Sequence, residues 1–440
     1  MGFMDIRRIK ITPLTVFILI NIISAFAFLV LAFRHGGDMW HWLAMNNIDD
    51  NFFDYKIHVA FVADRKHLYE RMTYYAGCFP ALAYCMYYFL YKIISVADFV
   101  PADNTELENL DFLNSVILYY TIFVLILFFL TMLSYTSADK KRAVVTLFAS
   151  LLMTVPVYEC LMIGNSVFLV MTLLLLACKL RQSNKPLQRE TALILIAVCA
   201  GFKIYPAVMG LLYLKEKRFK EAIRLTIYGI LLFFLPFAFF GGADGFKLWM
   251  DNVKQTMGMM GLGRIQCIKE LAYSIFTWNG IAVPDLIYQI LPIVFVILMI
   301  IFAWFTRYEH RRLFYLCAIM MFFPTSCCRY TLCLLIIPLM TWFFGSDREC
   351  GDAVKAYAWD YIEVLLYTGV FAIPVIWGRI THFKWELGYY MLSYVEVWIY
   401  IFAYGLLTYN MIRDIVSGKK AALSSGSTHS GTEDNEIQVH

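Results

Sequence analysis

The sequence predicts an all-α polytopic membrane protein. The chain of 440 residues is 61% hydrophobic and only 16% charged, and its mean hydropathy is +0.64. Soluble domains average roughly 45–50% apolar and about 25% charged residues. The apolar excess recurs in charge-poor runs of about the 20-residue length that a membrane helix needs. The clearest runs cover residues 12–33, 112–135, 225–240, 286–306, 364–377 and 391–411.

The two ends of the chain differ in character. The first apolar run follows MGFMDIRRIK and is too long for the hydrophobic region of a signal peptide, so we expect a retained membrane helix. The segment 417–440 is polar and rich in Ser and Gly, which is typical of disorder. We therefore expect one membrane domain over residues 1–416 and a disordered cytoplasmic tail over 417–440.

Basic clusters predict the topology, because loops rich in Lys and Arg stay cytoplasmic. If every basic cluster is inside, the number of crossings between neighbouring clusters is even. The chain then crosses the membrane about 12 times, with both termini cytoplasmic. The clusters lie at 7–10, 140–142, 179–189, 215–224, 307–312, 347–355 and 413–420.

The apolar stretch around CAGFKIYPAV cannot be a single crossing under this rule. Two short legs, about 191–201 and 204–214, keep the basic clusters on both sides of the stretch inside. Gly201 and Pro206 then mark the bend, and Lys203 is at its outer tip. This arrangement spares Lys203 the cost of a charge at the bilayer centre.

Two further hairpins follow from the same rule. The segment 156–166 joins two short apolar runs and contains Asn165. The segment FPTSCCRY, at 323–330, joins another pair and contains Arg329. The three tips are expected to face the same outer side.

The same outer side is expected to carry two long loops, 34–111 and 241–285. In the first, residues 54–70 mix polar and aromatic types, which predicts an amphipathic helix lying on the surface. The apolar piece 79–96 is expected to dip into the outer leaflet without crossing, because a crossing would put the next basic cluster outside. The first outer loop is therefore expected to be long and partly helical.

Carboxylates in the first outer loop are candidates for catalysis. Asp50 and Asp54 lie just after the first membrane helix, on the side where the hairpin tips gather. A carboxylate there is suited to deprotonate an acceptor hydroxyl. Tyr69, in the same loop, is a candidate for stacking on a sugar.

Cations at the tips suggest an anionic ligand. Lys203 presents a compact charge suited to a lipid phosphate, whereas Arg329 offers a bidentate contact. Asn165 is expected either to cap the helix that follows it or to contact substrate. Arg264 lies in a glycine-rich part of the second outer loop. Carboxylates on one wall and cations on another indicate group transfer from a phosphorylated lipid.

The residues that carry these candidates resemble glycosyltransferase family 87. The block from GNSVFLV through GFKIYPAVMGLLYLKEKRFKEAIRL to FFGG (164–242) has the strongest resemblance, and FPTSCCRYTLCLLIIPLM and DDNFFDYKI add to it. The resemblance implies the GT-C fold and a polyprenyl-phosphate hexose donor, often mannose. It also implies inversion at the anomeric carbon and a lipid or glycan acceptor outside the bacterial plasma membrane.

The resemblance also suggests roles for single residues. Asp54 matches the expected base by its spacing to the residues that follow, and a shift of the alignment by four would make Asp50 the base. Lys203 is carried over as a contact to the donor phosphate, with Tyr205 grouped beside it as substrate-binding. Arg329 is matched less closely.

A transporter or lipid flippase is the alternative, since broken helices and intramembrane cations are also typical of transporters. A transporter needs polar groups near the bilayer midplane, whereas the singled-out residues gather at tips and loops. No cofactor or nucleic-acid partner is predicted. The eight histidines form no metal-binding motif, and metal dependence stays open.

Overall fold

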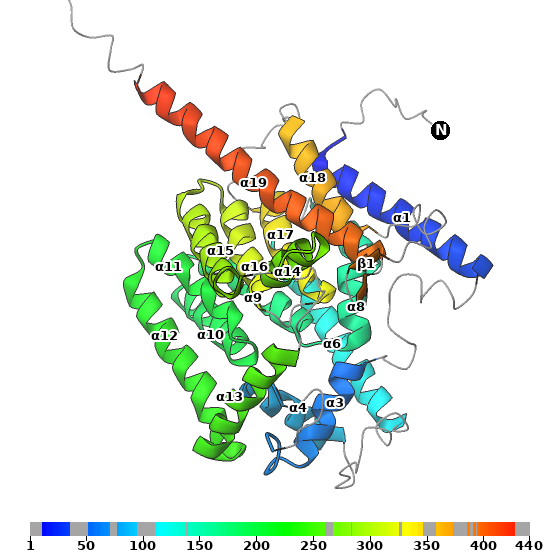
Figure 1. The fold of residues 1–440 in the computed structure, drawn as a ribbon, viewed down its shortest axis with the longest axis vertical. Coiled ribbons are helices and arrows are strands. Elements are labelled where there is room, and N and C mark those ends of the chain that lie inside the picture. Colours follow the sequence, from blue (N-terminus) through cyan, green and yellow to red (C-terminus); the bar gives the residue numbers. More distant parts are fainter. Residues whose placement is uncertain are drawn as a thin grey trace, which may run out of the picture.

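The described part of the chain is almost entirely helical (Figure 1). The computed structural model describes residues 11–35, 52–70, 77–94, 111–137, 140–259, 267–282, 284–324, 328–345, 358–372, 385–387, 390–392 and 394–426. These residues form 17 α-helices, with short 3-10 helices between some of them. The single departure from an all-α fold within these ranges is a two-stranded antiparallel ribbon, β1 (Trp385–Leu387) and β2 (Tyr390–Leu392).

The first half of the chain supplies eight described helices. They are α1 (Pro13–His35), α3 (Phe53–Ala63), α4 (Ala81–Ile94), α6 (Asp111–Ser134), α7 (Lys141–Leu152), α8 (Val155–Ile163), α9 (Val167–Arg181) and α10 (Pro186–Phe202). The expected runs 12–33 and 112–135 correspond to α1 and α6, and both predictions are confirmed.

The second half continues with helices and short 3-10 segments. They are η4 (Tyr205–Gly210), α11 (Leu211–Lys215), α12 (Phe219–Phe234), η5 (Leu235–Phe239), α13 (Gly242–Met259), α14 (Ile268–Trp278), α15 (Asp285–Phe305), α16 (Glu309–Phe322), η6 (Arg329–Leu335), α17 (Ile336–Phe344), α18 (Ala358–Phe371) and α19 (Tyr394–Gly426). The last helix continues past residue 416, where we expected the membrane domain to end.

Several helices are suited to a bilayer. Within the described ranges, three segments are long and apolar enough to cross a membrane: Pro13–Val30, Ile117–Ser134 and Phe219–Phe239. A fourth arises if α7 and α8, which meet at a 63° bend, count as one span. The expected total of about 12 crossings is not reached by this measure, because many other apolar helices are shorter than about 20 residues.

The stretch around Lys203 folds as a two-legged hairpin. Its first leg, α10, begins shortly after Arg181, and its second leg ends at α11, where Glu216 forms an ion pair with Arg181. Arg218 also donates to the backbone carbonyl of Arg181 over 3.1 Å. Both legs therefore start and finish at the same end of the bundle, as predicted.

Gly201 serves close packing at this bend. A Cβ there would lie 2.5 Å from Leu82 Cδ2 and 3.3 Å from the carbonyl oxygen of Leu232. Pro206 lies in the first turn of η4, where its missing N–H breaks no helix hydrogen bond. The glycine therefore lets α10 approach α4 and α12, and the proline starts the return leg.

The first hairpin, expected around 156–166, and the third, expected around 323–330, are also present, with one difference. In the third, α16 and α17 return to the same end, because Glu309 and Gly345 line one cavity. In the first, most of the expected connector 156–166 is the helix α8, so the turn is confined to the residues between Ile163 and Val167. Pro156 and Gly164 do not interrupt that helix, since Pro156 occupies its first turn and Gly164 follows its last residue.

The first outer loop differs from expectation. The helix α3 ends at Ala63, and most of its described side chains are buried, among them Tyr55, Ile57 and Val62. The prediction of a surface amphipathic helix over 54–70 is therefore wrong: α3 is apolar on most sides and packs inside the fold. The next helix, α4, has 14 residues and is about 21 Å long, shorter than the roughly 30 Å hydrocarbon core.

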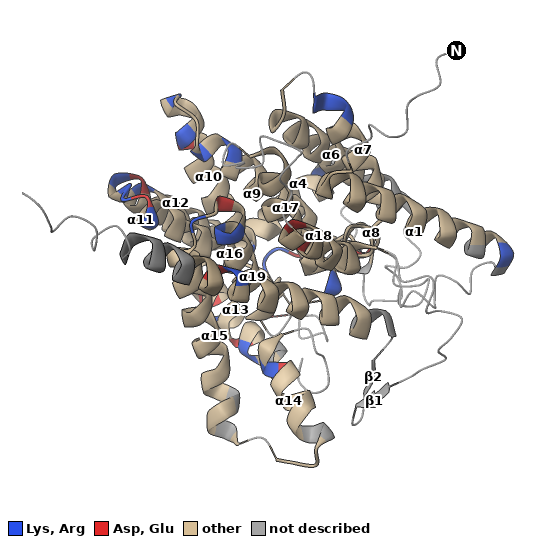
Figure 2. Cartoon of the chain, turned by 90° about the horizontal axis from the view of Figure 1, so that it is seen from above, with Lys and Arg blue, Asp and Glu red and all other residues tan. Residues whose placement is uncertain are grey.

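Charged residues concentrate at the end of the bundle that lies away from α3 and α4. Figure 2, a view from the top of Figure 1, shows Lys, Arg, Asp and Glu around α11, α12, α16 and α18. Arg181, which is 1% exposed, also pairs with Glu309, and Arg311 pairs with Asp414 over 2.6 Å. Basic clusters distant in sequence thus meet at one end, while α3, α4 and α13 lie together at the other (Figure 1).

The backbone at Gly164 controls how α3 meets the α8–α9 turn. Its φ is +70°, and a Cβ there would lie 2.8 Å from Tyr55 Cβ. We expect Gly164→Ala to destabilise the protein by about 1–3 kcal/mol through backbone strain, with a further cost from the clash. The measurement is the thermal unfolding midpoint of the detergent-solubilised protein.

Gly229→Ala is the matched control. Gly229 is inside α12, where a Cβ meets nothing within 4 Å, so the midpoint should stay or rise with helix propensity. Equal midpoints for Gly164→Ala and the wild-type protein would contradict the requirement for glycine where α3 meets the α8–α9 turn.

Candidate functional site

The site is built where two helix breaks meet the start of α3. The α8–α9 turn contributes Asn165, and the α10–η4 break contributes Lys203. The backbone N–H of Phe52 donates to the carbonyl of Met162 over 2.6 Å, which docks the start of α3 on the end of α8. Asp54, in the first turn of α3, is thereby brought beside Asn165.

The Asn165 side chain is held at both of its polar atoms. Its Oδ1 accepts a hydrogen bond from the backbone N–H of Val167 over 2.9 Å, and its Nδ2 donates to Asp54 Oδ2 over 2.5 Å. Only the carbonyl oxygen of an amide can accept from the Val167 N–H, so the NH₂ group must face Asp54. Asn165 lies one residue before Ser166, the N-cap position of α9, yet its side chain accepts from the first N–H of that helix and also orients the Asp54 carboxyl group.

Opposing effects act on the Asp54 carboxyl group. Burial raises its pKa, whereas the Asn165 hydrogen bond and the charge of Lys203 lower it. Burial has the largest effect, so the pKa lies above its ordinary value. A carboxyl group whose pKa is raised toward the working pH is suited to act as a general base. The three predicted residues Asp54, Asn165 and Lys203 therefore form one electrostatic unit.

Lys203 ends α10 in an extended backbone conformation. Its ammonium stands 4.2 Å from the centre of the Phe79 ring, a cation–π distance. The neighbouring Tyr205 starts η4 and is half-buried against the core. The lysine is thus held at a helix break by Phe79, which lies between α3 and α4.

His58 is a site residue that the sequence analysis missed. It lies one turn after Asp54 on α3. Its ring stacks on Tyr87 at 5.3 Å and contacts the tilted ring of Phe79 at 4.1 Å. Its Nδ1 is 3.2 Å from the hydroxyl of Tyr84. Burial and the charge of Lys203 lower the pKa of His58 to about 3, so the ring is neutral. The i, i+4 spacing from Asp54 was the sequence signal for it.

Two other candidates are placed in the protein interior. Arg329 starts η6 and pairs with Glu159 of α8, with Nε 3.2 Å from Oε2, and both side chains are buried. Tyr69 is 3% exposed, stacks on Phe237 and donates to the carbonyl of Phe79 over 3.2 Å. This packing does not favour sugar stacking by Tyr69, and the substrate contact of Arg329 stays a prediction.

Two predicted residues, Asp50 and Arg264, lie outside the described residues. Within the described ranges, no group of three or more His, Cys, Asp or Glu side chains is placed to hold a metal ion. The described site residues provide one carboxyl group, one amide, one ammonium and one neutral imidazole.

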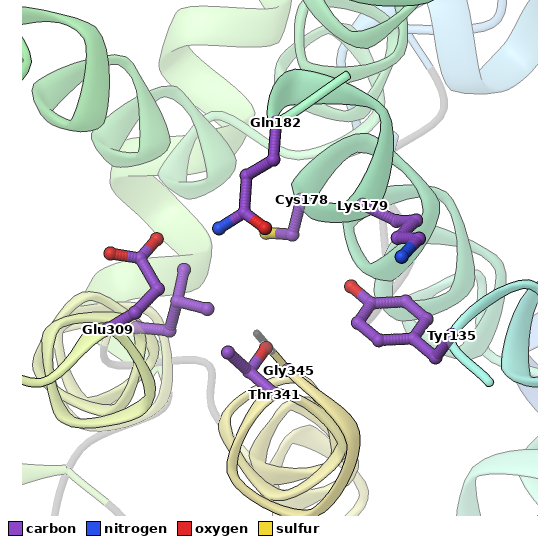
Figure 3. Close-up of a pocket in the computed structure, with 8 residues that line it drawn as sticks. Tyr135, Cys178, Lys179, Gln182, Glu309, Thr341 and Gly345 are labelled. Carbon is purple, nitrogen blue, oxygen red and sulfur yellow. The ribbon is translucent and has the colours of Figure 1, made fainter. Parts of the chain in front are cut away.

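A small cavity lies at the other end of α9 (Figure 3). Its volume is about 50 Å³, far below the roughly 300–1,000 Å³ of ligand pockets. Its Glu309 is already paired with Arg181 and Arg312. The cavity is therefore part of the ionic end of the bundle and is not the site for a sugar; its lining is Tyr135, Cys178, Lys179, Gln182, Glu309, Leu313, Thr341 and Gly345.

Comparison with known proteins gives one family. Neither a curated protein nor a solved structure matches the chain. The model of glycosyltransferase family 87 matches residues 89–328, more than half of the 440 residues. The matched range contains Asn165 and Lys203, and Asp54 precedes it but is joined to it by the Asn165 hydrogen bond. The chain belongs to glycosyltransferase family 87.

Proposed function

We propose that this membrane glycosyltransferase moves a hexose from a polyprenyl-phosphate donor to a lipid or glycan acceptor, with inversion. The hexose is expected to be mannose. The observation that supports the proposal is the meeting of Asp54, Asn165 and Lys203, in which a carboxyl group and an ammonium group share one site. Family membership supports the reaction class, and the charge arrangement supports the phosphorylated donor.

In the proposed step, Asp54 accepts the proton of the acceptor hydroxyl. The hydroxyl oxygen forms a bond to the anomeric carbon while the bond from that carbon to the phosphate oxygen breaks. The electron pair of the broken bond leaves with the polyprenyl phosphate, whose charge Lys203 stabilises. Attack opposite the leaving group inverts the anomeric centre.

The proposed orientation puts this site at the outer face of a bacterial plasma membrane, with both termini inside and about 12 crossings. Basic residues gather at the end of the bundle where α12 begins beside Arg218. From there α12 rises about 20 Å to Leu232, which packs near Gly201 at the other end. Nucleotide sugars are normally confined to the inside, so an outer site needs a lipid-linked donor.

A transporter or flippase is less well supported. Family membership favours sugar transfer, and the site residues lie at helix ends and in α3 instead of at mid-helix positions. A flippase also needs no general base, whereas the half-buried Asp54 is held in a defined orientation by Asn165. Loss of transfer on neutralising Asp54 separates the two functions.

Asp54→Asn should abolish sugar transfer, by at least about a hundredfold, because the amide cannot accept the hydroxyl proton. Folding and donor binding should stay near the wild-type level, since the Asn165 amide still finds an oxygen acceptor. The measurement is transfer from a polyprenyl-phosphate sugar, together with donor binding to the purified protein.

Asp50→Asn is the paired control for this assignment. We expect it to retain transfer. Full activity of Asp54→Asn, or loss only in Asp50→Asn, would reject Asp54 as the base.

Asn165→Ala should move the acid limb of the pH–rate profile to higher pH. The Asn165 hydrogen bond lowers the pKa of Asp54, so its removal raises that pKa further and protonates more of the base at a given pH. The measurement is kcat/KM against pH, and the shift must be upward.

Asn21→Ala controls for loss of a buried asparagine. Asn21 donates to the Phe17 carbonyl within α1 and should leave the acid limb in place. A downward shift in Asn165→Ala, or no shift, would argue against the assigned electrostatic unit.

The side of the membrane is tested at Ile204, which is 53% exposed beside Lys203. In a cysteine-free background, Ile204→Cys should react with a membrane-impermeant thiol reagent added outside intact cells. Reaction only from the inside would overturn the proposed orientation.

A further inference from the structure

The short segment Gly77–Phe79 is held in place through its backbone carbonyls. Asn252 Nδ2 lies 3.4 Å from the Gly77 oxygen, and Trp249 Nε1 donates to the Cys78 oxygen over 3.1 Å. Tyr69 donates to the Phe79 oxygen over 3.2 Å. Each of the three carbonyls is therefore the acceptor of a side chain from elsewhere in the fold.

Two of the three donors come from α13, in the second outer loop. Trp249 and Asn252 are one helical turn apart and are 3% and 5% exposed. The Trp249 ring packs on Phe246 at 5.6 Å and on Phe233 at 5.4 Å, which fixes its N–H toward the segment. Asn252 also donates to the Tyr69 carbonyl over 2.9 Å, so the same amide group contacts both Tyr69 and Gly77.

The side chain carried by this segment faces the site. The Phe79 ring is 4.2 Å from the Lys203 ammonium and 4.1 Å from the His58 ring centre. An aromatic face attracts a cation, and the attraction strengthens where water is excluded. The neutral imidazole of His58 supports Phe79 without adding a second positive charge next to Lys203.

We propose that Phe79 is a positioning residue for donor binding: its ring holds the Lys203 ammonium where it meets the donor phosphate, and α13 fixes that ring through Trp249 and Asn252. The inference rests on the proposed function, because it assumes that Lys203 contacts the phosphate. It gives the second outer loop a specific task in binding a lipid-linked phosphate.

The test is binding of a polyprenyl monophosphate to the full-length protein in lipid nanodiscs. Phe79→Leu keeps an apolar side chain and removes the aromatic face, so affinity should fall about three- to tenfold. Phe79→Tyr keeps the face and should bind like the wild-type protein. Trp249→Phe keeps an aromatic ring but removes the N–H that donates to the Cys78 carbonyl, together with part of the ring system, so it should give a smaller loss in the same direction.

The decisive comparison is with Lys203→Ala. If Phe79 acts through Lys203, Phe79→Leu should cause no further loss of affinity in the Lys203→Ala background, because the cation it positions is already gone. The same holds for Trp249→Phe in that background.

Two results would overturn the inference while leaving the proposed function intact. One is wild-type affinity in Phe79→Leu when Lys203→Ala binds weakly. The other is a full, additive loss in the double variant, which would mean that Phe79 contacts the lipid independently or is only structural. Wild-type affinity in Lys203→Ala itself would instead reject the phosphate contact of the proposed function, and the inference with it.

Discussion

The hydrogen bond between Asn165 and Asp54 is the contact on which the rest of the site depends. One amide side chain satisfies the exposed N–H at the start of α9 and fixes the carboxyl group of a helix more than a hundred positions earlier in the chain. This hydrogen bond requires a sharp turn after α8. Gly164 provides that turn because its backbone adopts the left-handed conformation. The Asp54 carboxyl group is thus positioned by a helix terminus, where backbone polar groups are available, and not by a regular helix interior.

Broken helices explain how an apolar protein holds polar groups in defined places. A continuous helix satisfies its own backbone and leaves only side chains for chemistry, whereas a break exposes backbone groups and fixes the residues around it. Here Asn165 and Lys203 lie at two such breaks, and both are brought to α3. At the other end of the bundle, buried ion pairs such as those of Arg181 join α9, α11 and α16. These contacts return each hairpin to a common end and so set the positions of the tips.

Local patterns predicted much of this architecture. Charge-poor runs predicted α1, α6 and α12, and the basic clusters predicted the fold-back at Lys203, because both signals depend on neighbouring residues. The packing of the segment between α1 and α6 was not predictable in the same way. The helix α3 is buried against α4, α6 and α8, and Tyr69 reaches the core through Phe237. The pairing of Arg329 with Glu159 and the ring contact of His58 with Phe79 also join residues whose proximity no local spacing reveals. For His58, the sequence contained one signal, its i, i+4 spacing from Asp54.

The most direct measurement is the product of a single transfer reaction by the purified wild-type protein. Polyprenyl-phosphate sugars and nucleotide sugars are supplied in parallel with a lipid-extract acceptor, and the anomeric configuration of the product is determined by NMR. The account predicts transfer from a polyprenyl-phosphate hexose alone, with release of polyprenyl phosphate and inversion at the anomeric carbon. Transfer from a nucleotide sugar in place of the lipid-linked donor, or retention of configuration, would contradict it.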